Sequence, residues 1–124
     1  MGWCGIRGAT SVSRNDKAEI LSATRELLGA MRAENEVSVE QIVSVFFTVT
    51  SDLDAAYPAQ AARELGWLET PLLCAADVPV PGSLPRCIRV LMHVDIDRAQ
   101  ADIRHVYLHE ARSLRPDWAE EVAR

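Results

Sequence analysis

The run Ile42–Thr50 constrains the fold more than any other segment of this 124-residue chain. The run is almost continuously apolar and rich in β-branched and aromatic residues, a composition typical of a buried strand. Ser44 and Thr48 interrupt it, and it is far shorter than the roughly 20 residues that a membrane-spanning helix needs. The segment therefore predicts an interior strand of a soluble domain with both of its faces covered.

A helical pattern precedes this strand. Ser13 and Asp16 form a Ser-x-x-Asp start signal close to a capping box, and apolar residues then recur at the spacing of one helix face until about Asn35. Charged residues occupy the rest of the circumference, so the segment predicts an amphipathic helix that packs on a sheet. Its apolar face comprises Ile20, Leu21, Thr24, Leu27, Leu28 and Met31.

The remaining patterns predict short elements and one domain spanning residues 1–124. The order of strands and helices predicts an α+β fold, a mixed β-sheet of about five strands with helices packed on one face. Because the other face then lacks cover, we expect a homo-oligomer. The predicted strands are Trp3–Ala9, Pro71–Ala75, Cys87–Ile96 and His105–Ala111, and the predicted helical segments are Ser38–Gln41, Pro58–Gly66 and Ala99–Ile103.

Composition narrows the class of protein. The formal net charge is −5, which argues against a nucleic-acid or membrane partner that binds a basic surface. The three cysteines show no Cys-x-x-Cys pair, so neither a disulfide framework nor a zinc site is expected, and a cytoplasmic location follows. His105 and His109 are four apart, which in a strand separates them by about 13 Å, so we expect no metal site.

The remaining candidates for functional residues are four arginines, at positions 7, 63, 89 and 115. Alternation along its strand puts Arg89 on one sheet face with Cys87 and Leu91, and Arg7 lies between two glycines. Each arginine alone is typical of a structural salt bridge. Together they suggest a pocket for a small polyanion, because a planar guanidinium binds a carboxylate through two hydrogen bonds. Cys74 has no nearby base and is interpreted first as a small buried apolar residue.

An ordered set of segments resembles the AroH-class chorismate mutases, the trimeric bacillus type. The matches follow one another at the family's spacing and cover nearly the whole chain apart from its two ends. The matching segments are Gly5–Thr10, Pro58–Leu65 with Gly66 and Trp67, Cys74, Cys87–Val90, Ile103–Leu108 and Leu114–Asp117.

The resemblance implies an isomerase of the shikimate pathway that converts chorismate to prephenate without a cofactor. It implies a trimer in a pseudo-α/β barrel, with sites between subunits. Arg89 would donate to the ether oxygen, Arg7 and Tyr107 would hold the enolpyruvyl carboxylate, and Asp77 and Cys74 would meet the ring hydroxyl. Further substrate-binding positions implied are Arg63, Arg115, Tyr57, Ala59, Gln60, Leu72, Leu73 and Leu114.

Three positions depart from the family. Asp77 replaces a glutamate and would reach about 1.4 Å less far, a displacement that can lower the rate. Gln60 replaces a lysine, and Leu73 replaces a threonine. A non-catalytic carboxylate-binding or regulatory trimer is therefore the alternative, and a trimeric imine deaminase is a weaker one. The tail from about residue 118 either orders over the ligand or stays mobile.

Overall fold

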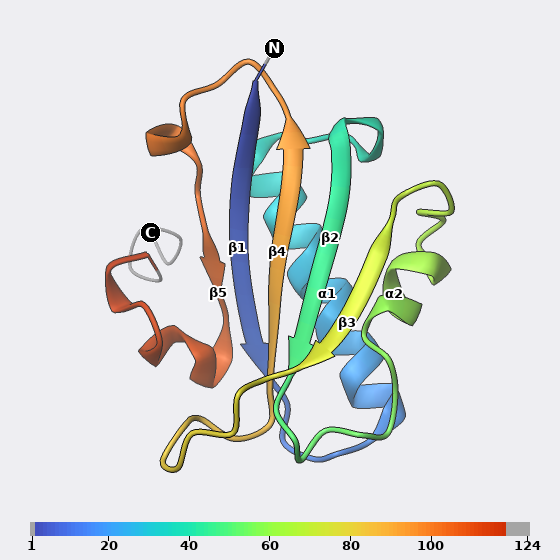
Figure 1. Ribbon diagram of the computed structural model, residues 1–124, viewed down its shortest axis with the longest axis vertical. Coiled ribbons are helices and arrows are strands. Elements are labelled where there is room, and N and C mark those ends of the chain that lie inside the picture. The colour runs from blue at the N-terminus through green and yellow to red at the C-terminus, as the bar shows by residue number, and fades with distance from the viewer. Residues whose placement is uncertain (1, 119–124) are drawn as a thin grey trace.

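The computed structural model describes residues 2–118, which form one mixed sheet with two α-helices (Figure 1). The sheet has five strands in the order β3-β2-β4-β1-β5. The strands are β1 (Trp3–Ser11), β2 (Ile42–Val49), β3 (Leu72–Ala76), β4 (Cys87–Asp95) and β5 (Val106–Tyr107), the helices are α1 (Lys17–Asn35) and α2 (Ala59–Glu64), and the 3₁₀ turns are Val39–Gln41, Gln100–Asp102 and His109–Ser113.

Strand β4 lies at the centre of the sheet. It pairs antiparallel with both β1 and β2, whereas β3 runs parallel to β2 and β5 runs parallel to β1. Arg89 of β4 is opposite Ala9 on β1 and opposite Thr48 on β2. The expected mixed sheet of about five strands is therefore confirmed, and its register holds Arg89 from both sides.

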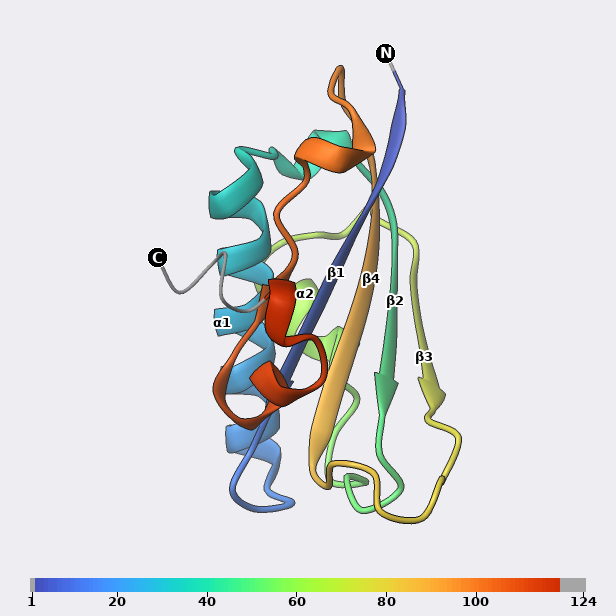
Figure 2. The same cartoon turned by 90° about the vertical axis from the view of Figure 1, so that its left-hand side faces the viewer.

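Both helices pack against the same face of the sheet, which leaves the other face without a covering layer (Figure 2). On the helix side, Phe47 and Met92 are fully buried and meet Leu27, Leu28 and Met31 of α1 in the main core. This burial of large apolar side chains is the principal stabilising contribution in a domain of this size. Among residues 2–118, no helix is long and apolar enough to cross a membrane.

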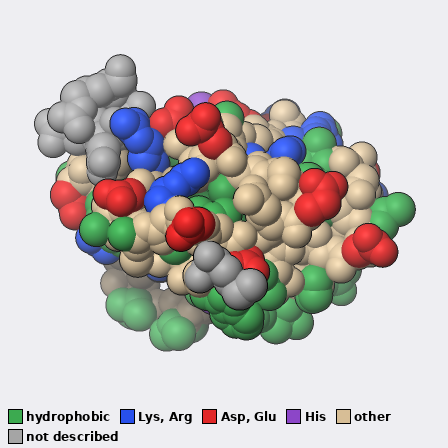
Figure 3. All heavy atoms as spheres, turned by 90° about the horizontal axis from the view of Figure 1, so that it is seen from above, with side chains coloured by type: hydrophobic (Ala, Val, Ile, Leu, Met, Phe, Trp, Pro, Cys, Tyr) green, Lys and Arg blue, Asp and Glu red, His purple; other side chains and the backbone are tan. Residues whose placement is uncertain are grey.

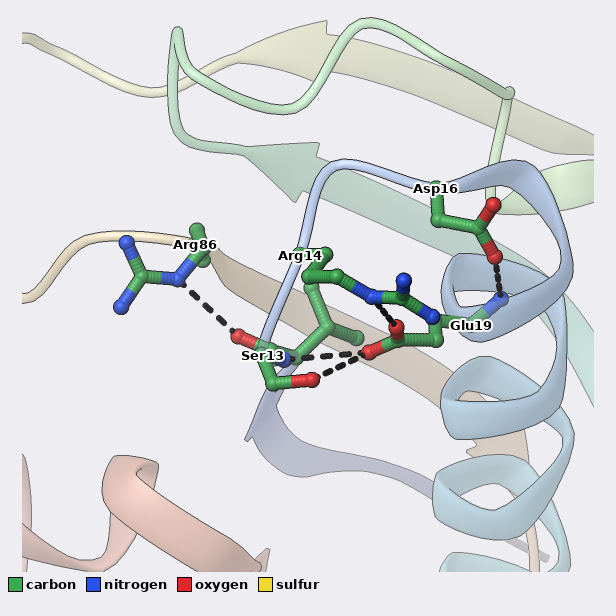
Figure 4. Close-up of polar contacts among 6 residues, drawn as sticks. Ser13, Arg14, Asp16, Glu19 and Arg86 are labelled. Carbon is green, nitrogen blue, oxygen red and sulfur yellow. Dashed lines mark hydrogen bonds and ion pairs between the residues drawn. The ribbon is translucent and has the colours of Figure 1, made fainter.

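The start of α1 differs in detail from the sequence prediction. Asp16, rather than Ser13, is the N-cap, and its carboxylate accepts the backbone N–H of Glu19 at 3.0 Å (Figure 4). Ser13 instead donates from its hydroxyl and its backbone N–H to the Glu19 carboxylate, which also accepts from Arg14 at 2.6 Å. Hydrogen bonds from Ser13 and Arg14 lower the pKa of Glu19. The loop and the first helical turn are thus joined through one carboxylate.

The last predicted strand, His105–Ala111, is wrong beyond Tyr107. Residue His109 has φ of 53°, in the left-handed region, and a 3₁₀ turn over His109–Ser113 follows it. A left-handed residue cannot continue a strand, so pairing with β1 ends after two residues. The turn instead buries Ala111 against Ala9 and Tyr107.

Strand β2 is covered on one face only within the chain, so the prediction of cover on both faces is wrong for the single subunit. Val45 and Phe47 are fully buried, whereas Phe46, between them, remains 40% exposed. Other large apolar side chains are also exposed, Leu73 on β3 and Trp3 on β1 among them. Viewed from above, hydrophobic side chains gather along one side of the molecule, at the lower edge of Figure 3.

Helix α1 lies very close to β1 at Gly8. A Cβ atom built at this position would collide with the sulfur of Met31 and lie 3.1 Å from a methyl group of Leu27. Gly8 also pairs with Val90 and Val106, so its backbone is held from both sides and has little freedom to move away. The glycine therefore permits the close packing of helix on sheet next to Arg7.

We expect Gly8→Ala to lower the free energy of unfolding by about 1–3 kcal/mol, because the added methyl overpacks the contact with Met31. Gly29→Ala is the matched control. A Cβ there meets nothing within 4 Å, so the same change in the interior of α1 should raise stability by up to about 1 kcal/mol. Urea unfolding of both variants at one protein concentration measures the difference, and equal effects would contradict this account of Gly8.

Candidate active site

The open face of the sheet carries an opposed pair of charges. Alternation along β4 directs Arg89 to this face, since its neighbours Ile88 and Val90 are buried on the helix side. Asp77 follows β3 immediately, and its backbone N–H donates to Val49 of β2 at 2.8 Å. Arg89 Nε and Asp77 Oδ2 are 3.2 Å apart, with the side chains 38% and 10% exposed. The two strands thus hold a cation and an anion side by side.

This pair retains hydrogen-bonding capacity. Arg89 Nε and Asp77 Oδ2 are both buried, and neither makes a hydrogen bond of acceptable angle within the described residues. The guanidinium has further N–H donors, and the Arg89 side chain is 38% exposed, so part of it stays available to a ligand. Arg89 and Asp77 line a hollow of about 390 Å³ together with Arg7, Phe46, Thr48 and Leu91.

Tyr107 lies beside three of the predicted arginines. Its ring is buried against Ala9, and burial raises the pKa of its hydroxyl, while the positive charges of Arg7, Arg115 and Arg89 act in the opposite direction. The net pKa is raised, so the phenol keeps its proton near neutral pH and can donate to a carboxylate. The structure thus brings Arg7, Arg89 and Tyr107 together, as the sequence prediction requires.

Cys87 belongs to the same surroundings, although the sequence prediction did not include it among the site residues. Burial raises the pKa of its thiol to about 11, despite the nearby Arg89 guanidinium. At neutral pH it is a neutral thiol, buried with Ala9, Tyr107 and Ala111 close to Arg89. Alternation along β4 places residues 87, 89 and 91 on one face, and this pattern could have identified Cys87 as a site residue. The same reasoning identifies Thr48 and Phe46 on the neighbouring strand β2.

A second group of predicted residues lies at the edge of the sheet beside α2. Tyr57, Gln60 and Cys74 line a hollow of about 520 Å³ there. Burial raises the pKa of the Cys74 thiol, while the backbone N–H of Ala59 and the charge of Arg63 oppose the shift. Cys74 is thus a neutral thiol at neutral pH, close to the start of α2. This group and the Arg89 group line two different hollows.

The three predicted wall leucines have different surroundings. Leu72 is partly buried and packs against the main core, whereas Leu73 is 58% exposed. Leu114 packs against the small cluster of Ala9, Cys87, Tyr107 and Ala111. Leu114 therefore belongs with the Arg89 group, and Leu73 lies on edge strand β3, which leads to Asp77.

Arg115 follows Leu114 and is held by its own neighbours. Its Nε and one terminal nitrogen donate to the two carboxylate oxygens of Asp117 at 3.3 and 3.1 Å. Its guanidinium carbon lies 3.5 Å from the centre of a Trp118 ring. The prediction for a mobile tail concerns mainly residues 119–124, which lie outside the described residues.

The arrangement suits recognition of a small dianion rather than acid–base or nucleophilic catalysis. Two described thiols near it, Cys74 and Cys87, have raised pKa values and so carry little of the reactive thiolate. Arg7 and Arg89 instead line one hollow, and the charges of Arg7, Arg89 and Arg115 all act on Tyr107. Such a site can bind carboxylates and stabilise charge that develops in a bound molecule.

Comparison with known proteins places the chain in a family. The family model for chorismate mutase type I matches residues 3–118. The chorismate mutase AroH of Thermus thermophilus is 54% identical over 114 residues, which are 91% of this chain and 93% of that protein. The chorismate mutase AroH of Bacillus subtilis (strain 168) is 46% identical over 114 residues, 91% of this chain and 90% of that protein.

Solved structures agree with this result. A chorismate mutase from Clostridium thermocellum superposes with a TM-score of 0.87 at 51% sequence identity, covering 88% of this chain and 97% of that one. The fold and the sequence therefore lead to the same family.

Proposed function

The chain belongs to the type I chorismate mutase family, and from that premise we propose that it rearranges chorismate to prephenate in clefts between the subunits of a homotrimer. It is an isomerase of aromatic amino acid biosynthesis, and we place it in the cytoplasm. The observation that carries the site assignment is the Arg89–Asp77 pair, 3.2 Å apart at the wall of a hollow.

The nature of this reaction explains why positive charges and a cavity of complementary shape are sufficient for catalysis. In the [3,3] rearrangement, one C–O bond of chorismate breaks as one C–C bond forms within the same molecule, so no proton transfer or covalent intermediate is needed. The enzyme must hold the flexible dianion in its compact conformer, which removes an entropic part of the barrier. It must also favour the polarised transition state over the ground state.

The charges of Arg89 and Asp77 are opposite in sign to the charges that develop in the transition state. As the C–O bond lengthens, negative charge grows on the ether oxygen and positive charge grows on the ring. Arg89 donates to the oxygen, and the Asp77 carboxylate stabilises the ring. Fixed charges at the wall of a concave site need no reorganisation during the reaction, so they act with large effect.

The shorter Asp77 side chain reaches this position because of its backbone. Its N–H donates to Val49 O at 2.8 Å, which continues the pairing of β2 and β3 one residue past the end of β3. The extended backbone keeps Asp77 on the same face as Leu73, and its carboxylate reaches Arg89. This geometry supports an active enzyme rather than the non-catalytic trimer, and the family assignment sets aside the imine deaminase.

The two carboxylates of chorismate require two sets of donors. Arg7 and the protonated Tyr107 hold the enolpyruvyl carboxylate, and Cys74 meets the ring hydroxyl. Arg63 and Arg115 attract or cover the ring carboxylate, while Tyr57, Ala59, Gln60, Leu72, Leu73 and Leu114 form the walls. Substrate and product, chorismate and prephenate, are the expected small-molecule partners.

The open sheet face and the two hollows support the proposed trimer. Phe46, Leu73 and Trp3 leave large apolar surfaces exposed on a single chain, which favours burial by further copies. A first group of residues, which includes Arg89, lines one hollow of the chain, and a second group, which includes Tyr57 and Cys74, lines another. Closed rotational symmetry would bring the first group of each subunit against the second group of its neighbour.

We expect Arg89→Ala to lower kcat/KM by at least about 10³-fold, because the main donor to the developing negative charge is lost. Replacement of Arg89 by citrulline, which keeps the shape and removes the charge, should give a similar loss. Arg104→Ala is the matched control, since Arg104 is 51% exposed and pairs with Glu34 at 3.6 Å.

The assay is the loss of chorismate absorbance, with prephenate identified in the product. Undiminished turnover in both Arg89 variants would overturn the mechanism. A wild-type protein that binds chorismate without converting it would favour the carboxylate-binding alternative instead.

A mixing experiment tests the shared site. Arg89→Ala and Arg63→Ala subunits should each be nearly inactive alone, and refolding them together should restore about a quarter of the wild-type sites by random assembly. Restoration occurs because some sites combine an intact Arg89 from one subunit with an intact Arg63 from the next. Activity no greater than the sum of the two separate proteins would place both arginines of each site in one chain.

The pH profile should be flat near neutrality. Burial raises the pKa of Tyr107 and of Cys74 above their ordinary values, so both groups keep their protons as the pH rises through the neutral range. We therefore expect kcat/KM to change by less than about twofold between pH 6 and pH 8. A bell-shaped profile centred in this range would indicate an acid–base step that the mechanism lacks.

A further inference from the structure

Trp118, at the end of the described chain, contacts three groups that surround the proposed site. Its ring centre lies 3.9 Å from that of His105 and 5.9 Å from that of Tyr107. The Arg115 guanidinium carbon lies 3.5 Å from the centre of a Trp118 ring. The indole also packs on the cluster of Ala9, Cys87, Tyr107 and Ala111, so it is anchored to the sheet rather than to its own loop alone.

The indole restricts Arg115 in a defined way. The Arg115 side chain is 45% exposed, and a long exposed side chain samples many rotamers. Trp118 covers a face of the guanidinium, and Asp117 takes the edge formed by Nε and one terminal nitrogen. The remaining edge of the guanidinium keeps N–H groups that can donate to a carboxylate. Stacking on an aromatic face thus fixes the direction in which the free edge points.

The same indole is linked to Arg7. His105, which stacks on Trp118, accepts the backbone N–H of Arg7 through Nδ1 at 2.9 Å. Trp118, His105 and Arg7 also line one hollow of about 510 Å³. One aromatic ring therefore contacts Arg115 directly and the strand that carries Arg7 through His105.

We propose that Trp118 is a positioning residue that holds Arg115 ready to bind a substrate carboxylate. The proposal rests on the function proposed above, because it assumes that Arg115 binds chorismate. Trp118 touches no reacting atom, so its contribution lies in the ground-state and transition-state binding of the carboxylate alike. Uniform binding of this kind changes KM and leaves kcat nearly constant.

The first test is the pair Trp118→Ala and Trp118→Phe. We expect the alanine variant to raise KM for chorismate by about 5- to 20-fold with kcat within about twofold of wild type, because the stacked cation is released. The phenylalanine variant keeps an aromatic face and should restore most of the affinity. Arg104→Ala is again the control, since the Arg104 side chain is 51% exposed, pairs with Glu34 and has no contact with Arg115 or Trp118 among the described interactions.

A double-mutant cycle shows whether Trp118 acts through Arg115. Arg115→Ala alone should raise KM, and adding Trp118→Ala to it should then raise KM by less than about twofold further. Independent, multiplicative effects of the two substitutions would overturn the positioning role. Intrinsic fluorescence supplies a second readout: prephenate should change the emission of the wild-type protein, and this change should be lost in a Trp118→Phe protein that still binds prephenate.

The outcomes separate this inference from the proposed function. If the wild-type protein lacks mutase activity, the proposed function fails before Trp118 is considered. If Arg115→Ala leaves KM unchanged, the assignment of Arg115 fails and the inference fails with it. If Arg115→Ala raises KM but Trp118→Ala does not, the inference alone is overturned and the proposed function stands.

Discussion

The register of β4 between β1 and β2 is the constraint on which core and site both depend. Hydrogen-bonded pairing on each side places Arg89 opposite Ala9 and Thr48. Because strand side chains alternate, the same register sends Val90 and Met92 into the core and Arg89 to the open face. A slip of one residue would exchange these sets, burying a guanidinium among aliphatic side chains. The stability of the core therefore also fixes the position of the principal cation.

The Arg89–Asp77 pair explains how such a cation is tolerated at an apolar face. An isolated charge there would lose much of its hydration. Asp77 offsets this cost by lying 3.2 Å from Arg89 Nε. The rest of the guanidinium, on a side chain that is 38% exposed, keeps N–H donors for a ligand. The same arrangement thus limits the cost of burial and matches the charge separation of the rearrangement.

Local patterns in the sequence were enough to predict most elements of the fold. The helical spacing of α1, the proline and glycine that bound α2, and the alternation in β4 all depend on residues close together in the chain. The end of β5 could not be predicted, because no local pattern marks the left-handed conformation of His109, and the turn that follows it buries Ala111 against Ala9, a residue far away in the sequence. Apolarity in β2 indicated two covered faces, but an apolar pattern does not reveal that Phe46 is left 40% exposed by its own chain.

The site was predictable to a lesser degree, for a similar reason. Alternation placed Arg89 on one face with Cys87, yet Cys87 was not counted among the site residues, and Thr48, opposite Arg89 on β2, was missed. The position of Asp77 depends on how far β3 extends along β2, which is a non-local pairing. No periodic pattern in the sequence indicated a role for Trp118. Its contacts with His105 and Arg115 form only because the end of the described chain returns to the sheet.

The site residues differ in how firmly the fold holds them, and this difference corresponds to their roles. Arg89 lies within a strand paired on both sides, so its charge is held in place at the position where the proposed mechanism requires it. Arg115 lies on the short segment after a 3₁₀ turn, where the backbone has no ladder to fix it. A carboxylate that must enter and leave needs a partner able to move, yet a freely moving arginine would bind weakly. Stacking on Trp118 reconciles these requirements, because it limits the guanidinium to one plane without bonding it to the sheet.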